Sequence, residues 1–227
     1  VGWAHASQYH DKRSRTQGRY VGSMPRPRVH DVESVLDVAE QLAGEGGPAA
    51  VTIRAVAARS GASSGSLYHS FASREALLGT MWLRAARRFL ALQRDAVSEV
   101  LGAAAPDPVA AVVAAARTLS VLRARHPAST RLLTTQRRDA LLDTGLLPDE
   151  LAADLRDLDG EVVDLLRTLA RAMWNRDDRA AVETIAICVV DLPTALLVNR
   201  RQRTIDVLDL LDAAVKAILA RTPIGIR

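Results

Sequence analysis

Residues 52–71, TIRAVAARSGASSGSLYHSF, place serine hydroxyls, a tyrosine and a histidine within a short segment of mostly small side chains. Serine hydroxyls can donate to or accept from bases and phosphates, and a tyrosine hydroxyl can bind a phosphate. A helix with small side chains can enter a major groove about 12 Å wide and bring its backbone close to the base edges. The chemistry of this segment is therefore that of a surface that contacts double-stranded DNA.

The spacing of three residues predicts how this segment is held. Ala57 and Gly61 stand four apart, and Leu67 follows six residues after Gly61. In a helix-turn-helix, a small residue lies where the helices cross, a glycine adopts the left-handed turn, and an apolar residue of the second helix packs against the first. Thr52 and Ser63 are favourable N-caps for the two helices. We therefore expect a helix-turn-helix over this segment.

The second of these helices is expected to have one apolar side and one polar side. Leu67 and Phe71 point inward. The outward positions are then Ser63, Ser64, Gly65, Ser66, Tyr68 and His69. A buried seam would not use such a set, whereas a surface that faces DNA tolerates it.

Helical periodicity also dominates the rest of the chain, with no alternating strand pattern and no internal repeat. The expected helices lie at about 30–43, 52–60, 63–71, 74–101, 108–125, 128–142, 148–174, 179–199 and 205–221. This pattern predicts an all-α fold of about nine helices. The short helices come first, and a long fourth helix joins this small head to a larger helical bundle.

The composition limits the classes of protein that the chain can belong to. Apolar residues make up 48% of the chain, which is enough for a sizeable core. The longest apolar run, at 109–116, is far shorter than the roughly 18 residues of a membrane span. Cys188 is the only cysteine, so no internal disulfide can form. Its neighbours are apolar, and it is therefore expected to be a small buried residue. We expect a cytoplasmic protein with no membrane partner, no metal and no cofactor.

The basic residues are concentrated at the start of the chain. The net charge is +4 overall, while residues 1–30 alone carry +5. Such an arm attracts polyanions, nucleic acid first; the alternative is a passive solvated tail. Residues 1–29 are expected to be a disordered arm. Gly22-Ser23-Met24 also resembles a junction, in which case 1–23 is an added extension.

Residues 30–78 resemble the DNA-binding domain of TetR-family transcriptional regulators. The matching motif is T-I-R-x-V-A-x-x-S-G-x-S-x-G-S-L-Y-x-x-F-x-S-R-E-A-L, which runs from Thr52 to Leu77 without gaps. The resemblance implies a homodimer whose heads bind the two halves of an operator. It also implies that residues 79–227 form a helical domain that dimerises and encloses a pocket for a small-molecule effector.

The resemblance implies a contact for each matching position. Thr52, Tyr68 and Arg74 would contact phosphates, and Arg54 would reach a base edge or a phosphate. The residues facing the groove would be Ser63, Ser64, Ser66 and His69. Because Gly65 and the serines leave few large base-reading side chains, specificity is expected to depend on Arg54, water and DNA shape.

Two C-terminal segments are predicted to form the dimer interface. Their apolar stripes contain Ile185, Cys188, Leu192 and Leu196 in the first segment, and Leu208, Leu211 and Val215 in the second. An apolar arc this wide suits a helix that packs on its own domain and on a partner. The alternative is an ordinary core within one subunit. Pro193 is expected to kink the first segment.

The effector is only coarsely predicted. After residue 78 the aromatic residues are Trp82, Phe89 and Trp174, too few for an aromatic cage. A pocket lined by Leu, Val and Ala fits an apolar or amphipathic small molecule. Candidate polar or flexible contacts are Arg117, Gln136, Met173 and Trp174.

The sequence is compatible with three functions. The first is a repressor that a small molecule releases from a pseudo-palindromic operator. The second is a regulator of the same fold without such an effector, either an activator or a protein that responds to another protein. The third is an all-helical enzyme or interaction bundle, for which the sequence offers no nucleophile–base pair, metal spacing or phosphate loop. We expect a regulator and not an enzyme.

Overall fold

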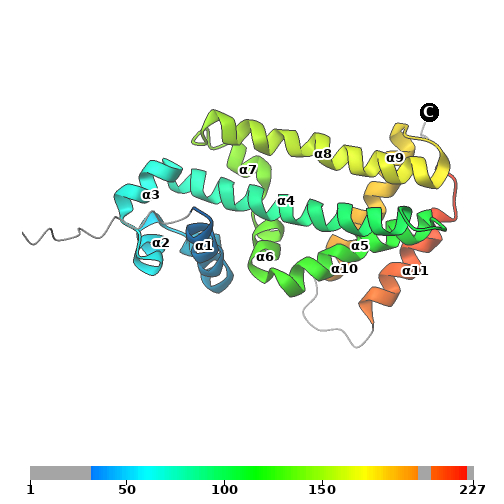
Figure 1. Ribbon diagram of the computed structural model, residues 1–227, viewed down its shortest axis with the longest axis horizontal. Helices are drawn as coiled ribbons and strands as arrows, with labels where there is room; N and C mark the ends of the chain where they lie inside the picture. Colours follow the sequence, from blue (N-terminus) through cyan, green and yellow to red (C-terminus); the bar gives the residue numbers. More distant parts are fainter. Residues whose placement is uncertain (1–31, 199–205, 224–227) are drawn as a thin grey trace, which may run out of the picture.

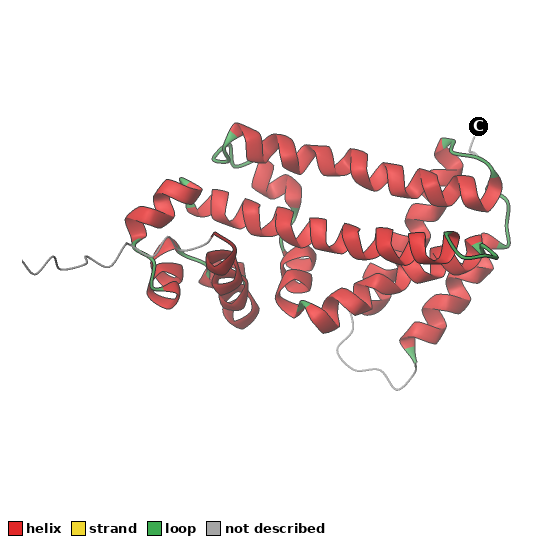
Figure 2. Cartoon of the chain, viewed as in Figure 1, coloured by secondary structure: helices red, strands yellow, loops and turns green. Residues whose placement is uncertain are grey.

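The computed structural model describes residues 32–198 and 206–223. The predicted basic arm at 1–29 lies outside these residues. Within them the chain consists of helices joined by short loops, without a strand (Figure 2). The expected all-α class is confirmed.

The head occupies one end of the molecule (Figure 1). Its elements are α1 (Val32–Gly46), the short 3-10 turn η1 (Pro48–Ala50), α2 (Ile53–Ser60) and α3 (Ser64–Phe71). The apolar stripe of α1, which includes Leu36 and Ala43, is buried against the other helices of the head. These helices follow the ranges expected from the sequence to within two or three residues.

The body is built around one long helix. Its elements are α4 (Arg74–Leu101), α5 (Pro108–Arg125), α6 (Pro127–Thr135), α7 (Arg138–Leu142), α8 (Asp149–Trp174), α9 (Arg179–Ala186), the π turn η2 (Ile187–Asp191), α10 (Leu192–Leu197) and α11 (Val207–Leu219). Figure 1 shows α4 running from the head along the body, with α8 beside it. When the continuous elements α9, η2 and α10 are counted as one helix, the described residues form ten helices, one more than the nine predicted.

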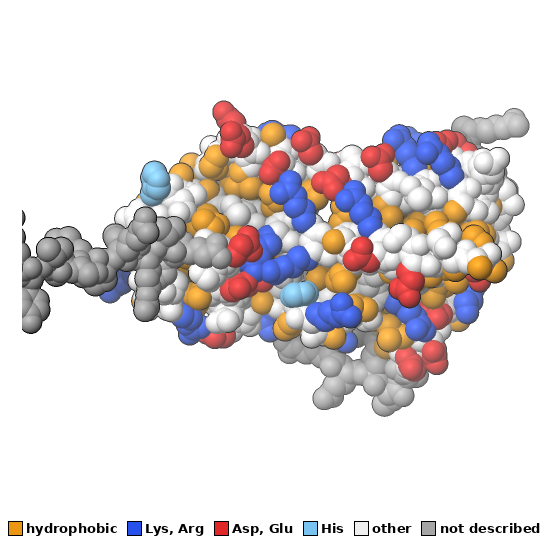
Figure 3. Space-filling model, viewed as in Figure 1, with side chains coloured by type: hydrophobic (Ala, Val, Ile, Leu, Met, Phe, Trp, Pro, Cys, Tyr) orange, Lys and Arg blue, Asp and Glu red, His pale blue; other side chains and the backbone are white. Residues whose placement is uncertain are grey.

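Ion pairs connect the exposed sides of α4 and α8. Arg87 lies 3.3 Å from Asp154, and Arg94 lies 2.9 Å from Glu161. Figure 3 shows basic and acidic side chains interspersed over these two helices, so this face has no patch of a single charge. Each of these exposed pairs contributes little to stability, since water and salt screen them.

The predicted helix at 128–142 is divided in two, which accounts for the extra helix. Gln136 adopts an extended conformation after α6, and its carbonyl accepts a 3.0 Å hydrogen bond from the indole N–H of Trp82. This carbonyl is therefore satisfied by a residue 54 positions away rather than by the next helical turn. The local sequence carries no glycine or proline here, so periodicity alone could not reveal the break.

The expected disturbance at Pro193 takes the form of a π turn. Proline has no backbone N–H and its ring crowds the carbonyl four residues earlier. The chain accommodates this by widening over Ile187–Asp191, where the Leu192 N–H bonds the Ile187 carbonyl five residues back. The helix thus continues through the proline.

The head and the body share apolar packing. The core of the head contains Leu67 and Phe71 together with Leu132 of α6 and Leu141 of α7. A second core joins α4, α5, α8, α9 and α11 and includes Cys188, whose burial raises the pKa of its thiol to about 11. The boundary expected at residue 78 therefore falls within α4, where no gap separates the two parts.

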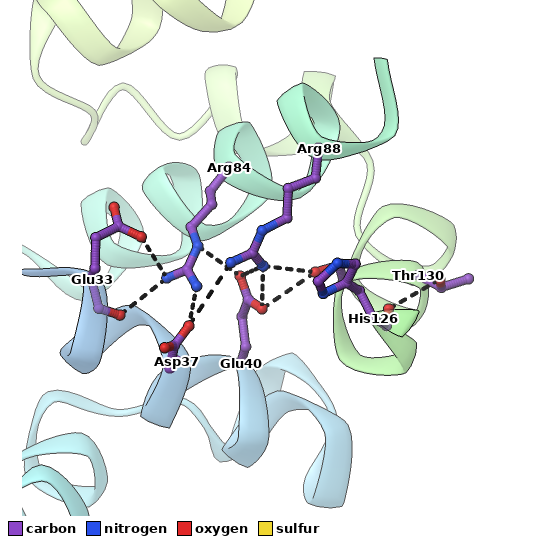
Figure 4. Close-up of polar contacts among 8 residues, drawn as sticks. Glu33, Asp37, Glu40, Arg84, Arg88, His126 and Thr130 are labelled. Carbon is purple, nitrogen blue, oxygen red and sulfur yellow. Dashed lines mark hydrogen bonds and ion pairs between the residues drawn. The ribbon is translucent and has the colours of Figure 1, made fainter. Parts of the chain in front are cut away.

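A network of charges holds α1 against α4 (Figure 4). Glu33, Asp37 and Glu40 follow one another along α1, and Arg84 and Arg88 face them from α4. Arg84 lies 3.4 Å from Glu33 and 3.5 Å from Glu40 and bonds Asp37. The spacing of three and four residues places these charges on facing sides of the two helices.

Glu40 is the buried centre of this network. Its side chain is 10% exposed, and both of its oxygens accept hydrogen bonds from Arg88, at 2.8 and 3.0 Å. The Ser129 hydroxyl of α6 donates a further bond of 3.3 Å to it. One carboxylate therefore connects α1, α4 and α6.

Replacing Glu40 with Gln should lower the free energy of unfolding by about 3 kcal/mol, because it leaves Arg88 without its main buried partner. The matched control is Glu45→Gln, which removes an exposed carboxylate from the same helix and should have a much smaller effect. Urea unfolding of the two variants would measure the difference. Equal destabilisation by both would show that the buried pair does not hold the head.

Candidate nucleic-acid interface

The turn between α2 and α3 has the predicted helix-turn-helix geometry. Gly61 ends α2 in the left-handed region, with φ of 73°, and its N–H bonds the Ala57 carbonyl. The Thr52 hydroxyl caps α2 by accepting the Ala55 N–H at 3.1 Å, and the Ser63 hydroxyl caps α3 by accepting the Ser66 N–H at 3.0 Å. Both hydroxyls keep their own hydrogen for a further acceptor.

The two sides of α3 are arranged as expected. Leu67 is 2% exposed and Phe71 is 5% exposed, and both pack in the core of the head. The exposed positions of α3 are Ser64, Gly65, Ser66, Tyr68, His69 and Ser70, with Ser63 at the cap. Tyr68 is 55% exposed, which is unusual for a large aromatic side chain with an apolar ring. The structure thus brings the predicted groove-facing residues to one solvent-accessible surface.

The arginines of the head have different surroundings. Arg54 is exposed in the first turn of α2, and no ion pair joins it to another described residue. Arg59 pairs with Glu45 at 2.6 Å. Arg74, predicted to contact phosphate, donates from Nε to the Val51 carbonyl at 2.7 Å and also bonds Pro48. Its contacts fasten the start of α4 to the loop before α2, a role that the motif did not indicate.

Each acidic side chain of the described head has a basic neighbour. Three of the four acids of α1 face α4 as described above, and the fourth, Glu45, pairs with Arg59. Glu75 lies 3.6 Å from Arg74. Negative charge is therefore neutralised within the protein. The unpaired positive charge of this part of the head lies at Arg54, next to the exposed side of α3.

The four predicted effector contacts have separate surroundings. Arg117 forms a two-bond ion pair with Asp212 of α11, at 2.7 and 2.8 Å. The carbonyl of Gln136 is occupied by Trp82. Met173 and Trp174, at the end of α8, pack against the core of the body. Each of the four thus has a structural contact, and no described hollow brings them together.

A hollow that the sequence did not reveal lies between α5, α6 and α10. Its volume is about 280 Å³. The lining residues are Leu119, Arg123, Pro127, Thr130, Arg131, Thr134, Leu197 and Val198. In the sequence, the hollow is indicated locally by Arg123 and Arg131 on either side of Pro127. Its other wall comes from Leu197 and Val198, which are distant in the chain.

Part of the predicted dimer interface is corrected by the structure. Ile185, Cys188, Leu211 and Val215 are fully buried within the subunit, so they form its core instead. Leu192, Leu196 and Leu208 are half-buried at the edge of that core. The exposed apolar side chains nearby are Ile187, Val190 and Leu210. The apolar arc is as wide as predicted. The residues predicted to face a partner subunit lie on its buried side, and its exposed side carries Ile187, Val190 and Leu210.

The same helical segment passes a simple test for a membrane span. Arg179–Leu197 is 19 residues long and apolar enough by composition, and about a third of it is buried. One such helix is weak evidence for a membrane, because a core helix meets the same criteria. Its buried residues, among them Ile185 and Val189, pack in the core of the body.

An all-helical chain with a helix-turn-helix head on a larger helical body is typical of one class of bacterial regulators. The family model for bacterial regulatory proteins of the tetR family matches residues 35–81. This part of the chain is thus similar to bacterial regulatory proteins of the tetR family, as its motif indicated. No protein of curated function matches its sequence.

Solved structures share the fold over most of the chain. PfmR, a TetR family transcriptional regulator from Thermus thermophilus, has a TM-score of 0.59 at 18% identity, covering 82% of this chain and 97% of its own. FadR from Bacillus subtilis, in complex with stearoyl-CoA, has 0.59 at 13%, covering 84% and 98%. AibR, in complex with isovaleryl coenzyme A and operator DNA, has 0.60 at 15%, covering 85% and 98%. At these identities the likeness concerns the fold.

Two glycines of the helix-turn-helix should respond oppositely to alanine. Gly61→Ala should destabilise the chain by about 1–2 kcal/mol, because an alanine resists the left-handed conformation. Gly65→Ala should stabilise it by about 0.5 kcal/mol, since a methyl group there meets nothing nearer than the Ser63 hydroxyl at 3.9 Å. Thermal unfolding of both variants tests the pair. A shift in the same direction for both would contradict the turn geometry.

Proposed function

We propose that the chain is a homodimeric DNA-binding transcriptional regulator whose α3 lies in the major groove of an operator half-site. The observation that carries the proposal is the exposed side of α3, polar and small, supported from behind by the buried Leu67 and Phe71. A protein of this kind acts by binding rather than by catalysis. In a symmetric dimer, the half-sites lie about 34–36 Å apart or a multiple of that distance.

The proposed contacts follow from the accessible donors. Thr52 and Ser63 cap their helices through the hydroxyl oxygen, so each hydroxyl hydrogen is free to donate to a phosphate. Tyr68 reaches a phosphate from the side of α3, and the ring of His69 contacts the groove wall. The serines at 64 and 66 complete the groove contacts. Arg54 reaches a base edge, where a guanine is its best partner.

Most of the phosphate neutralisation is proposed to come from residues outside the described head. Within the head, Arg54 is unpaired while Arg59 and Arg74 have partners in the protein. Nucleic-acid affinity, however, rises with the number of phosphates neutralised. The basic residues of the arm at 1–29 are the natural supplement. Arg74, whose side chain is 35% exposed, remains a proposed phosphate contact beside its bonds to the protein.

We further propose that a small amphipathic molecule controls DNA binding, and that the chain is a repressor released by it. FadR and AibR, which share the fold, are each described with an acyl coenzyme A, and AibR also with operator DNA. An effector that favours a head arrangement unsuited to the operator must weaken DNA binding, and by linkage DNA weakens effector binding by the same factor. Apolar hollows beside polar groups support such a ligand.

The dimer is proposed to form through the outer side of η2, α10 and α11. Ile187, Val190 and Leu210 are each more than 40% exposed, and the half-buried Leu192 and Leu208 adjoin the core beneath them. Exposed apolar side chains on η2 and α11 are typical of a surface that a partner covers. A second copy of the chain covers it in the symmetric arrangement that the operator requires.

Arg54→Ala should reduce affinity for the best operator by about 1–3 kcal/mol and relax the base preference at one position. Arg59→Ala is the matched control on the same helix, because Arg59 is already paired with Glu45. Fluorescence anisotropy on operators selected from random duplexes, at several salt concentrations, would measure both. A uniform loss for all sequences with a shallower salt slope would reassign Arg54 to a phosphate. Equal affinities of the two variants would contradict the proposed role.

Val190→Glu should weaken dimerisation at least tenfold, because it buries a carboxylate without a partner, close to its symmetric copy. Val32→Glu makes the same change at an exposed valine of the head and should leave the oligomeric state unchanged. Sedimentation velocity over a range of concentrations would follow both. A Val190 variant that remains a dimer at the wild-type concentration would remove this face as the interface.

A further inference from the structure

The hollow between α5, α6 and α10 contains two arginines, Arg123 and Arg131, that form no ion pair with an acidic side chain of the described residues. Most arginines in the described part of the chain pair with a carboxylate, and no carboxylate lines this hollow. Arg123 donates to the Leu197 carbonyl at 3.0 Å, and Arg131 donates to the Gly44 carbonyl. Each guanidinium has five N–H donors. Both therefore keep donors and a full positive charge for a ligand.

The other walls of the hollow supply complementary chemistry. Leu119, Leu197 and Val198 give it an apolar side. The Thr130 and Thr134 hydroxyls donate to carbonyls of their own helix or its cap, at 3.2 and 2.8 Å, and so present lone pairs that can accept a hydrogen bond. A ligand that fills this site needs an anionic group, an apolar body and, between them, a donor such as an amide or hydroxyl.

We propose that this hollow binds an amphipathic anion, in which a carboxylate or phosphate contacts Arg123 and Arg131 and an apolar chain lies against Leu119 and Leu197. The inference rests on the proposed function, because it names the effector class and its site. Arginine suits carboxylates and phosphates equally, since its planar fork matches the oxygens of both. Carboxylate and phosphate are therefore distinguished by experiment.

Arg131 also connects this site to the head. Its partner, Gly44, lies at the C-terminal end of α1. The contact between α1 and α6 is close, because a Cβ added to Gly44 would lie 3.4 Å from the Ala128 Cβ. The next residue, Ser129, bonds the buried Glu40. The helix that lines the hollow is thus the helix that supports α1.

This connection gives the effector a way to change DNA binding. An anion that draws the Arg131 guanidinium toward it competes with the Gly44 carbonyl for the same donors. Removing that bond, and shifting α6 with it, loosens the support of α1 on which the orientation of the head depends. A ligand shifts the equilibrium only by its differential affinity for the two arrangements, and Arg131 is the group whose contacts differ between them.

Calorimetric titration of the full chain without DNA tests the site directly. The probes are octanoate, octanoyl-CoA and, as the uncharged control, octanol. At least one charged probe should bind tenfold or more tightly than octanol, and Arg123→Gln and Arg131→Gln should each reduce its affinity at least tenfold. The control is Arg125→Gln. Arg125 is an exposed residue of α5, like Arg123, but does not line the hollow, so this variant should bind the probe as the wild type does. Binding of octanoyl-CoA alone would identify phosphate as the recognised group, binding of octanoate alone would identify the carboxylate, and binding of both would show that the site accepts either anion.

Three results would overturn the site: no binding of either charged probe, affinities no better than that of octanol, or equal losses in the Arg125 variant. Arg131→Lys, which keeps the charge, guards against loss of folding and should bind with intermediate affinity. The coupling is tested by adding the bound probe to the operator complex. The wild type should lose DNA affinity at least fivefold and Arg131→Gln should not. A chain that binds an operator but no probe overturns this inference alone, whereas one that binds the probe but no duplex overturns the proposed function alone.

Discussion

The buried carboxylate of Glu40 is the constraint on which the arrangement of head and body depends. Removing a carboxylate from water costs several kcal/mol unless charged partners and hydrogen bonds replace the water. Here Arg88 contributes two bonds and Ser129 a third. Those partners come from α4 and α6, so Glu40 can be satisfied only when α1 is seated against both helices. A displaced head would leave the carboxylate without partners. The position of α1 against α4 and α6 is therefore specific as well as stable.

The long helix α4 extends that constraint to the rest of the molecule. Its first turn is fastened by Arg74 to the loop before α2, its middle carries the arginines that face α1, and its second half packs in the core of the body. Leu132 of α6 and Leu141 of α7 complete the core of the head. A movement of α6 therefore alters both the apolar and the charged contacts of α1. The two parts of the chain therefore share contacts across the boundary that the sequence suggests.

The sequence allowed the local features to be predicted, because each depends on residues close together in the chain. The left-handed turn at Gly61, the caps at Thr52 and Ser63 and the inward side of α3 were all evident from spacing. The Glu40 network was not, since its partners lie 48 and 89 residues away. Helical periodicity also identifies an apolar side without identifying its neighbour. For that reason the apolar stripes predict that Cys188 and Val215 contact a partner subunit, whereas both residues fill the core of their own subunit.

The distribution of charge bears on how the proposed regulator would distinguish one operator from another. Internal pairing leaves Arg54 as the unpaired cation of the described head, and α3 offers hydroxyls and a histidine instead of long base-reading side chains. Serines tolerate several bases, since a hydroxyl both donates and accepts. Discrimination would then depend on one arginine and on how easily a sequence adopts the shape that lets the backbone of α3 approach. Such a reader is sensitive to the exact placement of its head, because a small shift removes shape complementarity along the whole helix at once. The buried Glu40, with partners on both α4 and α6, provides the specific placement of the head that this mode of recognition would require.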